Sequence, residues 1–176
     1  MQQKEFNKTI PNLPDPIWIV VHHGAGQLDF NGVNELHKTW KMPDGSIVPG
    51  LKSSLGYYCG YGWFIEKTGK LYQARRDNEE QAACRGFNKC SVNIGLQGDF
   101  EKEQPTKWQL ESLHDLIGEL QEKYKIPNKN IVGHRELSQT TCPGKNLFSW
   151  LVKNFPNSNL GRIEIKKLDK GSSGMG

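Results

Sequence analysis

The sequence has no hydrophobic run long enough to cross a membrane. A transmembrane helix needs about 20 consecutive apolar residues, whereas the 176-residue chain has strand-length runs such as IWIVV at 17–21. The opening residues, MQQKEFNKTIPNLPDP, also lack the apolar central region of a secretory signal. We therefore expect no membrane insertion, no cleaved leader and synthesis in the cytoplasm.

The sequence also lacks the dense cysteine spacing of a small disulfide-stabilised domain. Its four cysteines are Cys59, Cys84, Cys90 and Cys142, and a chain of this length can bury a core without disulfides. Cys84 and Cys90 could pair, but free cysteines are commonly buried, which favours two buried thiols here. Cys142 stands apart because it follows His134 closely in sequence.

Concentrated positive charge is missing as well. The formal net charge of +4 would suit an anionic polymer, but the basic residues are scattered except at Lys166, Lys167 and Lys170. Scattered charge is typical of a solvated surface. We therefore expect no nucleic-acid partner.

Segments of strand and helix character alternate along the chain, which predicts an α/β fold. A capping box formed by Thr106 and Gln109 begins a helix with one apolar stripe. The predicted strands are 17–21, 60–66, 71–74, 92–98 and 130–133.

These segments fit one domain. We expect an N-terminal arm at 1–16, the folded domain at 17–156 and a tail or linker at 157–176, which ends in GSSGMG.

A second, shorter helix is predicted to begin at Asn31. On its apolar face, His37 is either a core or cleft-edge histidine or a substrate contact. Residues 42–56, rich in Gly, Pro and Ser, predict a long loop of the kind that shapes binding sites. The apolar face comprises Val33, Leu36, His37 and Trp40.

Potential zinc ligands come from two places in the sequence. His134 and Cys142 share one loop, and His22 with His23 follow the apolar run at 17–21. Catalytic zinc usually has three protein ligands drawn from His, Cys and carboxylates. Because side chains alternate along a strand, at most one of the two histidines is expected to reach the metal, and alternation does not say which.

Four segments, taken in order, resemble the type-2 N-acetylmuramoyl-L-alanine amidases and peptidoglycan recognition proteins, including phage amidases. The resemblance covers about residues 16–152 and implies a mixed central β-sheet flanked by helices. It also implies Zn²⁺-dependent hydrolysis of the amide bond between N-acetylmuramic acid and L-alanine of peptidoglycan. The segments are VVHHGAG at 20–26, GYGWFI at 60–65, GFNKCSVNIGLQGDF at 86–100 and GHRELSQTTCPG at 133–144.

The resemblance assigns roles to individual residues. His22, His134 and Cys142 match the metal ligands. Tyr61 matches a tyrosine that stabilises the oxyanion or positions the water, and Thr140 matches a supporting position.

Four further residues are candidates for substrate binding. Arg75 resembles an arginine thought to contact the muropeptide, with a surface salt bridge as the alternative. His23 is predicted to act in substrate binding or in support of the metal ligands. The candidates are His23, His37, Arg75 and Asn88.

The chain departs from the family pattern at two places. Ala83 stands where many members have a histidine, and the loop at 42–56 is longer than expected. Both departures bear on how the stem peptide is bound.

Two other functions remain open. A non-catalytic peptidoglycan-binding module would share the fold, although the retained Cys142 and Tyr61 favour an enzyme. A cysteine hydrolase would use Cys142 as nucleophile and His134 as base, without metal. Under the favoured hypothesis the protein is a monomer that acts on the bacterial cell wall after phage-type or other non-classical release, in lysis, wall remodelling or attack on competitors.

Overall fold

The computed structural model describes residues 10–156, so residues 1–9 of the predicted N-terminal arm and the predicted tail at 157–176 lie outside the described residues. A five-stranded sheet has the order β5-β4-β6-β1-β7. Strands β4, β6, β1 and β7 run parallel, and β5 pairs antiparallel with β4 at one edge. The strands are β1 (Trp18–His23), β4 (Trp63–Ile65), β5 (Leu71–Gln73), β6 (Ser91–Leu96) and β7 (Ile131–Gly133).

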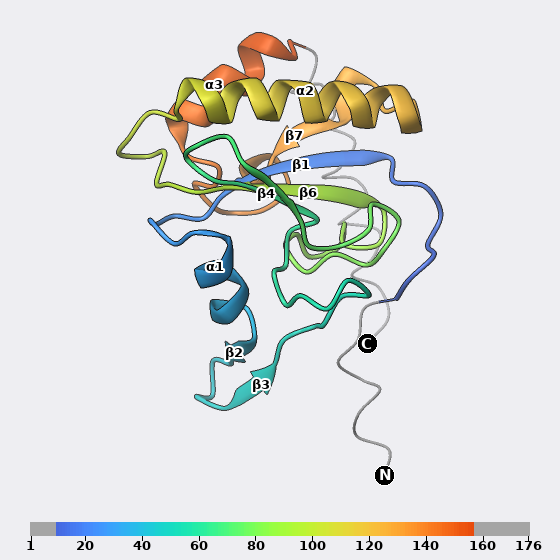
Figure 1. Cartoon of the computed structure of the whole chain (residues 1–176), viewed down its shortest axis with the longest axis vertical. Coiled ribbons are helices and arrows are strands. Elements are labelled where there is room, and N and C mark those ends of the chain that lie inside the picture. The colour runs from blue at the N-terminus through green and yellow to red at the C-terminus, as the bar shows by residue number, and fades with distance from the viewer. Residues whose placement is uncertain (1–9, 157–176) are drawn as a thin grey trace.

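Helices α2 (Lys107–Tyr124) and α3 (Lys145–Asn154) cover one face of this sheet (Figure 1). The main core lies between these helices and the sheet and includes Ile19, Ile94 and Ile117. The predicted capping box of α2 is present, with Thr106 accepting from the backbone of Gln109. The fold therefore confirms a mixed sheet flanked by helices.

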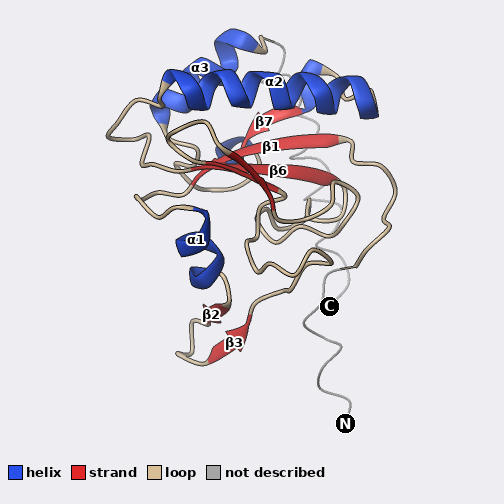
Figure 2. Ribbon diagram, in the orientation of Figure 1, coloured by secondary structure: helices blue, strands red, loops and turns tan. Residues whose placement is uncertain are grey.

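The opposite face carries α1 (Phe30–Leu36) and the small hairpin of β2 (Thr39–Lys41) and β3 (Ile47–Pro49), as Figure 2 shows. Phe30 and Val33 of α1 pack with Phe64 of β4.

The predicted start and face of this helix were wrong. Asp29, not Asn31, caps α1 by accepting from the backbone N–H of Gly32. Leu36 is exposed and Trp40 lies in β2, because the helix ends one turn earlier than its apolar spacing suggested. Part of the predicted loop at 42–56 forms β3.

Strand β1 is buried on both faces along its whole length, as its continuous apolar run predicted. Ile19 and Val21 face the helices, whereas Trp18 and Val20 face the other side. Alternation therefore carries His22 to the face away from α2 and α3 and His23 to the helix face. Among the described residues, no helix combines the length and apolarity that a membrane span requires.

None of the four cysteines, all of which lie within residues 10–156, forms a disulfide; Cys59, Cys84 and Cys142 are buried and Cys90 is half-buried. This confirms the prediction of two thiols rather than a disulfide at Cys84 and Cys90, although Cys90 is less buried than predicted.

Candidate active site

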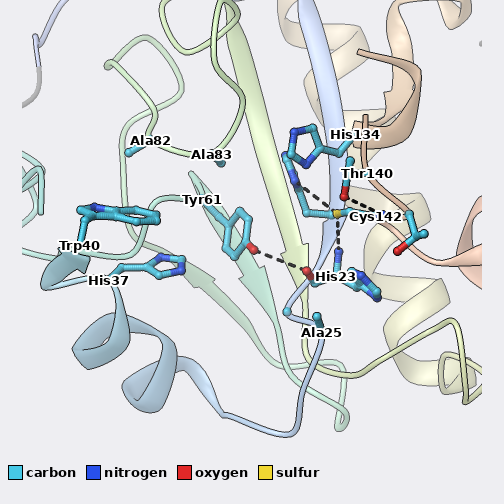
Figure 3. A pocket seen from close by; sticks show the side chains of 13 residues that line it. His23, Ala25, His37, Trp40, Tyr61, Ala82, Ala83, His134, Thr140 and Cys142 are labelled. Atoms are coloured by element: carbon cyan, nitrogen blue, oxygen red, sulfur yellow. Dashed lines mark hydrogen bonds between the residues drawn. The ribbon is translucent and has the colours of Figure 1, made fainter. Parts of the chain in front are cut away.

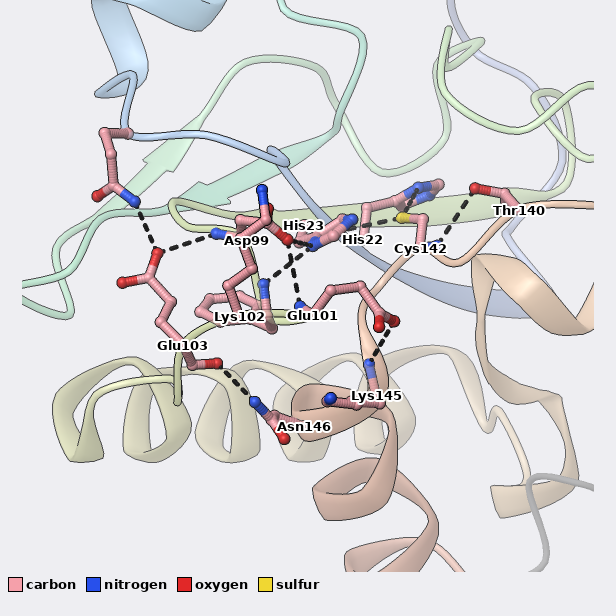
Figure 4. A network of polar contacts seen from close by, with 12 residues as sticks. His22, His23, Asp99, Glu101, Lys102, Glu103, Thr140, Cys142, Lys145 and Asn146 are labelled. Carbon is pink, nitrogen blue, oxygen red and sulfur yellow. Dashed lines mark hydrogen bonds and ion pairs between the residues drawn. The ribbon is translucent and has the colours of Figure 1, made fainter.

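Two neighbouring parallel strands deliver the three potential metal ligands. His22 is the penultimate residue of β1. His134 directly follows β7, the strand that is hydrogen-bonded to β1. Because parallel strands end at the same edge of a sheet, the two imidazoles meet there, with ring centroids 4.6 Å apart. The loop after His134 then returns Cys142 to the same point, and Figure 4 shows its sulfur beside His22.

These residues offer a donor set that fits zinc. The ligand atoms of His22, His134 and Cys142 all lie within 4.8 Å of one another. The Cys142 Sγ and His22 Nδ1 are 3.7 Å apart, close to the separation of about 3.5 Å that tetrahedral Zn–S and Zn–N bonds of about 2.3 and 2.0 Å imply. Two neutral nitrogens and one sulfur leave a fourth position for water or substrate.

Burial keeps both histidines neutral. Desolvation, followed by the nearby His134, lowers the pKa of His22 to about 3, against the opposing effect of its hydrogen bond with Asn93. Desolvation also lowers the pKa of His134. A neutral imidazole keeps one nitrogen lone pair for a metal ion.

Cys142 is buried, and its sulfur accepts from one backbone donor. Burial raises the pKa of its thiol to about 12, although the backbone N–H of His23 opposes this shift. That N–H donates to the sulfur across 3.4 Å. The protein alone therefore keeps the thiol protonated, and a bound cation would be needed to favour the thiolate.

Tyr61 lies over the sheet next to the three ligands (Figure 3). Its ring centroid is 5.2 Å from that of His22, and its hydroxyl is 3.5 Å from the carbonyl oxygen of His23. The ring fits there because Gly95, opposite His22 in β6, has no side chain. Burial raises the pKa of Tyr61, so the phenol remains a hydrogen-bond donor.

His37 and Trp40 form the far wall of the same pocket. Their rings stack with centroids 5.4 Å apart, and His37 meets Tyr61 edge-on at 5.6 Å. The backbone N–H of Gly60 donates to His37 Nδ1 over 2.9 Å, so the neutral ring carries its proton on Nε2. Burial, and then Arg75, lower the pKa of His37 to about 4.

The pocket has a volume of about 360 Å³ and includes most of the predicted site residues. Thr140 lies at its wall, where its hydroxyl accepts from the backbone N–H of Cys142 over 3.2 Å. Ala83, in the place of the family histidine, leaves that part of the wall without an imidazole. The residues that line the pocket include His22, His23, His37, Trp40, Tyr61, Ala83, His134, Thr140 and Cys142.

His23 also reaches the pocket but is oriented differently from His22. Its Nδ1 accepts from the backbone N–H of Phe100 at 3.2 Å and lies 3.9 Å from Asp99 (Figure 4). Burial lowers the pKa of His23, and the negative charge of Asp99 acts against that shift. The ring is therefore held by the segment after β6 rather than by the metal-ligand group.

The predicted substrate contact by Arg75 is not supported. Its side chain is fully buried, lies outside the pocket and donates to backbone carbonyls of two loops. We assign Arg75 to the support of these loops. The accepting carbonyls belong to Leu51, Tyr58, Cys59 and Glu80.

Asn88 also lies outside this pocket. Its Oδ1 accepts from the backbone N–H groups of Ala83 and Cys84 at 3.0 and 2.9 Å. It thereby shapes the wall at Ala83, and its side chain lines an adjoining hollow that also contains Trp40.

Sequence reasoning missed two residues of this region. Trp40 was predicted to lie on a helix face, and Asn93 fell within the predicted strand at 92–98 without an assigned role. Asn93 is fully buried and its Oδ1 lies 2.7 Å from His22 Nε2. A polar side chain inside the buried run SVNIGL was the available signal, because buried amides need hydrogen-bond partners.

Comparison with known proteins agrees with this fold. The family model described as N-acetylmuramoyl-L-alanine amidase matches residues 12–145. Peptidoglycan-recognition protein SD of Drosophila simulans is 30% identical over 99 residues, which cover 56% of this chain and 53% of that protein. The chain spans about half the length of the curated relatives it matches.

Two solved structures show the same architecture. The endolysin N-acetylmuramoyl-L-alanine amidase LysCS from Clostridium intestinale matches with a TM-score of 0.67 and 27% identity, covering 84% of this chain and 88% of that one. Drosophila PGRP-LB matches in fold, with a TM-score of 0.66 and 23% identity over 86% of this chain and 87% of that one. Since the family model spans well over half of the sequence, the chain belongs to the N-acetylmuramoyl-L-alanine amidase family.

Proposed function

We propose that the protein is a zinc-dependent peptidoglycan amidase that cleaves the bond between N-acetylmuramic acid and the L-alanine of the stem peptide. The observation that carries this proposal is the convergence of His22, His134 and Cys142 with the Tyr61 phenol around one pocket. Family membership supports the reaction class.

A bound zinc supplies Lewis-acid chemistry: it lowers the pKa of water and polarises a carbonyl. His22 and His134 would hold it as neutral imidazoles, and Cys142 would hold it as a thiolate supported by the N–H of His23. The three ligand atoms already lie within 4.8 Å of one another, so these roles bring together side chains that are neighbours in the structure.

The remaining groups would act on the substrate. Tyr61, kept protonated by burial, would donate to the oxygen that gains negative charge as the amide carbonyl is attacked. His37 would donate from Nε2 toward the substrate, and Trp40 beside it offers an apolar surface. His23 and Thr140 lie at the edge of the metal-ligand group, where they would orient water or substrate.

The geometry disfavours a cysteine hydrolase. Such an enzyme needs an activated thiolate, but burial raises the pKa of the Cys142 thiol to about 12. Burial also lowers the pKa of His22 and His134, which makes both imidazoles weak acceptors for the thiol proton. A non-catalytic binding module is the second candidate. The presence of a complete donor set together with Tyr61 favours catalysis over binding alone.

The setting follows from the proposed chemistry. Two matched structures are named endolysins, and we extend the proposal to a monomeric, bacteriolytic enzyme of this kind that acts on the bacterial cell wall. Its antimicrobial effect would come from separating glycan strands from their peptides.

Metal analysis and product identification test the proposal together. We expect about one zinc per chain, loss of activity with a strong chelator and recovery on addition of Zn²⁺. Purified peptidoglycan should release peptides with a free L-alanine amino terminus. Full activity in metal-free protein would overturn the zinc assignment, and intact peptidoglycan with tight muropeptide binding would identify the binding module.

Substitutions at Cys142 separate the metal ligand from the nucleophile. Cys142→Asp keeps an anionic ligand for zinc, so some metal and some activity should remain, whereas Cys142→Ala should lose most of both. Cys90→Ala, a half-buried thiol outside the pocket, is the matched control and should behave as wild type. A zinc-loaded but inactive Cys142→Asp protein, with wild-type activity that resists chelators, would favour the nucleophile.

A further inference from the structure

A short chain of buried polar side chains leads from β6 to His22. In the parallel register, Val20 pairs with Asn93 and His22 pairs with Gly95. Asn93 therefore points to the same face of the sheet as His22. It reaches His22 diagonally across Gly95, which has no side chain to block the contact. Both Asn93 and Ser91, two residues earlier on this face, are buried.

The hydrogen bonds in this chain have only one consistent direction. Ser91 Oγ donates to the carbonyl oxygen of Phe87 at 2.7 Å, and a carbonyl can only accept. Ser91 Oγ then accepts from Asn93 Nδ2 at 2.9 Å. This contact fixes the amide of Asn93 with its oxygen, Oδ1, toward His22.

The orientation of Asn93 in turn decides where His22 carries its proton. An amide oxygen can only accept, so the contact of 2.7 Å with His22 Nε2 requires the hydrogen to be on Nε2. The Nδ1 atom of the neutral ring is then unprotonated, and it is the atom that lies 3.7 Å from Cys142 Sγ. The lone pair thus faces the group of potential ligands.

We propose that Ser91 and Asn93 are positioning residues that lock His22 in the tautomer with the proton on Nε2 and aim Nδ1 at the metal. Without this lock, a neutral imidazole also populates the tautomer with the proton on Nδ1, which cannot bind a metal through that atom. This positioning role concerns the same site as the proposed function, and it rests on the proposed function for the identity of the metal.

Zinc affinity is the first test. In Asn93→Leu, the leucine side chain has a volume similar to that of asparagine but offers no hydrogen-bond acceptor to His22. Loss of a hydrogen-bond partner of a metal-ligating histidine typically weakens metal affinity by about 10–100-fold. We expect the zinc Kd, measured by competition with a chromophoric chelator, to rise by about this factor. Gln109→Met is the matched control: it removes another buried amide, which donates to Ile65 and Gln97 carbonyls outside the pocket. Its zinc Kd should equal that of wild type.

The tautomer itself is the second test, because a purely structural role would leave it unchanged. Imidazole ¹⁵N NMR of the metal-free wild-type protein should show His22 protonated on Nε2, and Asn93→Leu should show protonation on Nδ1 as well. Ser91→Ala frees the amide of Asn93 to rotate, so it should shift both the tautomer and the zinc Kd in the same direction by a smaller amount.

The proposal fails if wild-type His22 carries its proton on Nδ1, or if folded Asn93→Leu binds zinc as tightly as wild type. Should Asn93→Leu not fold, the wild-type tautomer and the zinc Kd of Ser91→Ala decide the question. A wild-type protein that binds no zinc would defeat the proposed function, whereas the NMR measurement would still decide whether the lock exists.

Discussion

Tyr61 offers the clearest test at the scale of one residue, because one of its atoms has a chemical role and the rest of its ring packs. Tyr61→Phe removes the hydroxyl and keeps the contacts with His22 and His37. We expect an intact fold, normal zinc content and a turnover lower by about 10²-fold, equivalent to about 2.7 kcal/mol. Tyr72→Phe, on β5 outside the pocket, is the matched control and should leave turnover unchanged.

Steady-state turnover and zinc content of the two variants give the comparison. Wild-type turnover in Tyr61→Phe, with chemistry shown to be rate-limiting, would leave Tyr61 with a packing role alone.

His37 predicts a pH dependence of stability. Its pKa is about 4 in the folded protein and about 6.5 in an unfolded chain. Between these values the unfolded state binds a proton that the folded state does not, so stability is fully present above pH 6.5 and falls as the pH drops. The expected slope is up to about 1.4 kcal/mol per pH unit.

His37→Gln removes this titration while its amide oxygen can still accept from Gly60. Urea unfolding of metal-free protein at pH 7 and pH 5 should therefore show a smaller loss of unfolding free energy in the variant than in wild type, by about 2 kcal/mol. Equal losses in the two proteins would contradict burial of a neutral His37.

At the scale of the element, strand β6 leaves space for the ring of Tyr61 at Gly95. A Cβ atom on Gly95 would lie 2.4 Å from Cδ2 of Tyr61, so Gly95→Ala should push the ring away from His22. We expect turnover to fall at least as far as in Tyr61→Phe. Gly118→Ala on α2, where an added Cβ meets no atom within 4 Å, is the matched control.

The control should retain turnover and gain up to about 1 kcal/mol of stability from helix propensity. Turnover is measured by peptidoglycan hydrolysis, and stability is measured by thermal unfolding. Wild-type turnover in Gly95→Ala would show that the position of Tyr61 does not matter to the reaction.

At the scale of the whole molecule, hydrogen bonds from Arg75 hold two loops at the edge of the sheet. Its guanidinium donates to carbonyls at Leu51 and Cys59 over 2.6 and 2.7 Å, and further bonds reach Tyr58 and Glu80. Arg75→Met would leave buried carbonyls without donors, at a cost of about 3 kcal/mol. Arg76→Met removes the neighbouring exposed arginine and is the matched control.

Urea unfolding should show the loss of stability in Arg75→Met alone, and limited proteolysis should show faster cleavage within 51–60. An Arg75→Met protein of unchanged stability that binds muropeptide poorly would instead restore the predicted substrate contact.

Local patterns determined much of the fold and part of the site. The continuous apolar run at 17–21 predicted a central strand, and the spacing of Thr106 and Gln109 predicted the start of α2. Both predictions were possible because burial of a strand on both faces and helix capping are visible in the types of a few neighbouring residues. Alternation along a strand predicted that at most one of His22 and His23 would face the other potential ligands, and the family resemblance selected His22. The identity of the bound metal and the role of each site residue remain predictions.

Tertiary structure decided what depends on segments far apart in sequence. The sequence shows an arginine at position 75, but only the fold reveals that loops from 51–60 and 80 close over it and bury it. Trp40 joined the pocket wall because α1 ended before it, and Asn93 met His22 because β6 pairs with β1 in one register. Periodicity records which face of an element is buried, whereas the partner that a buried polar group meets is set by how distant elements pack.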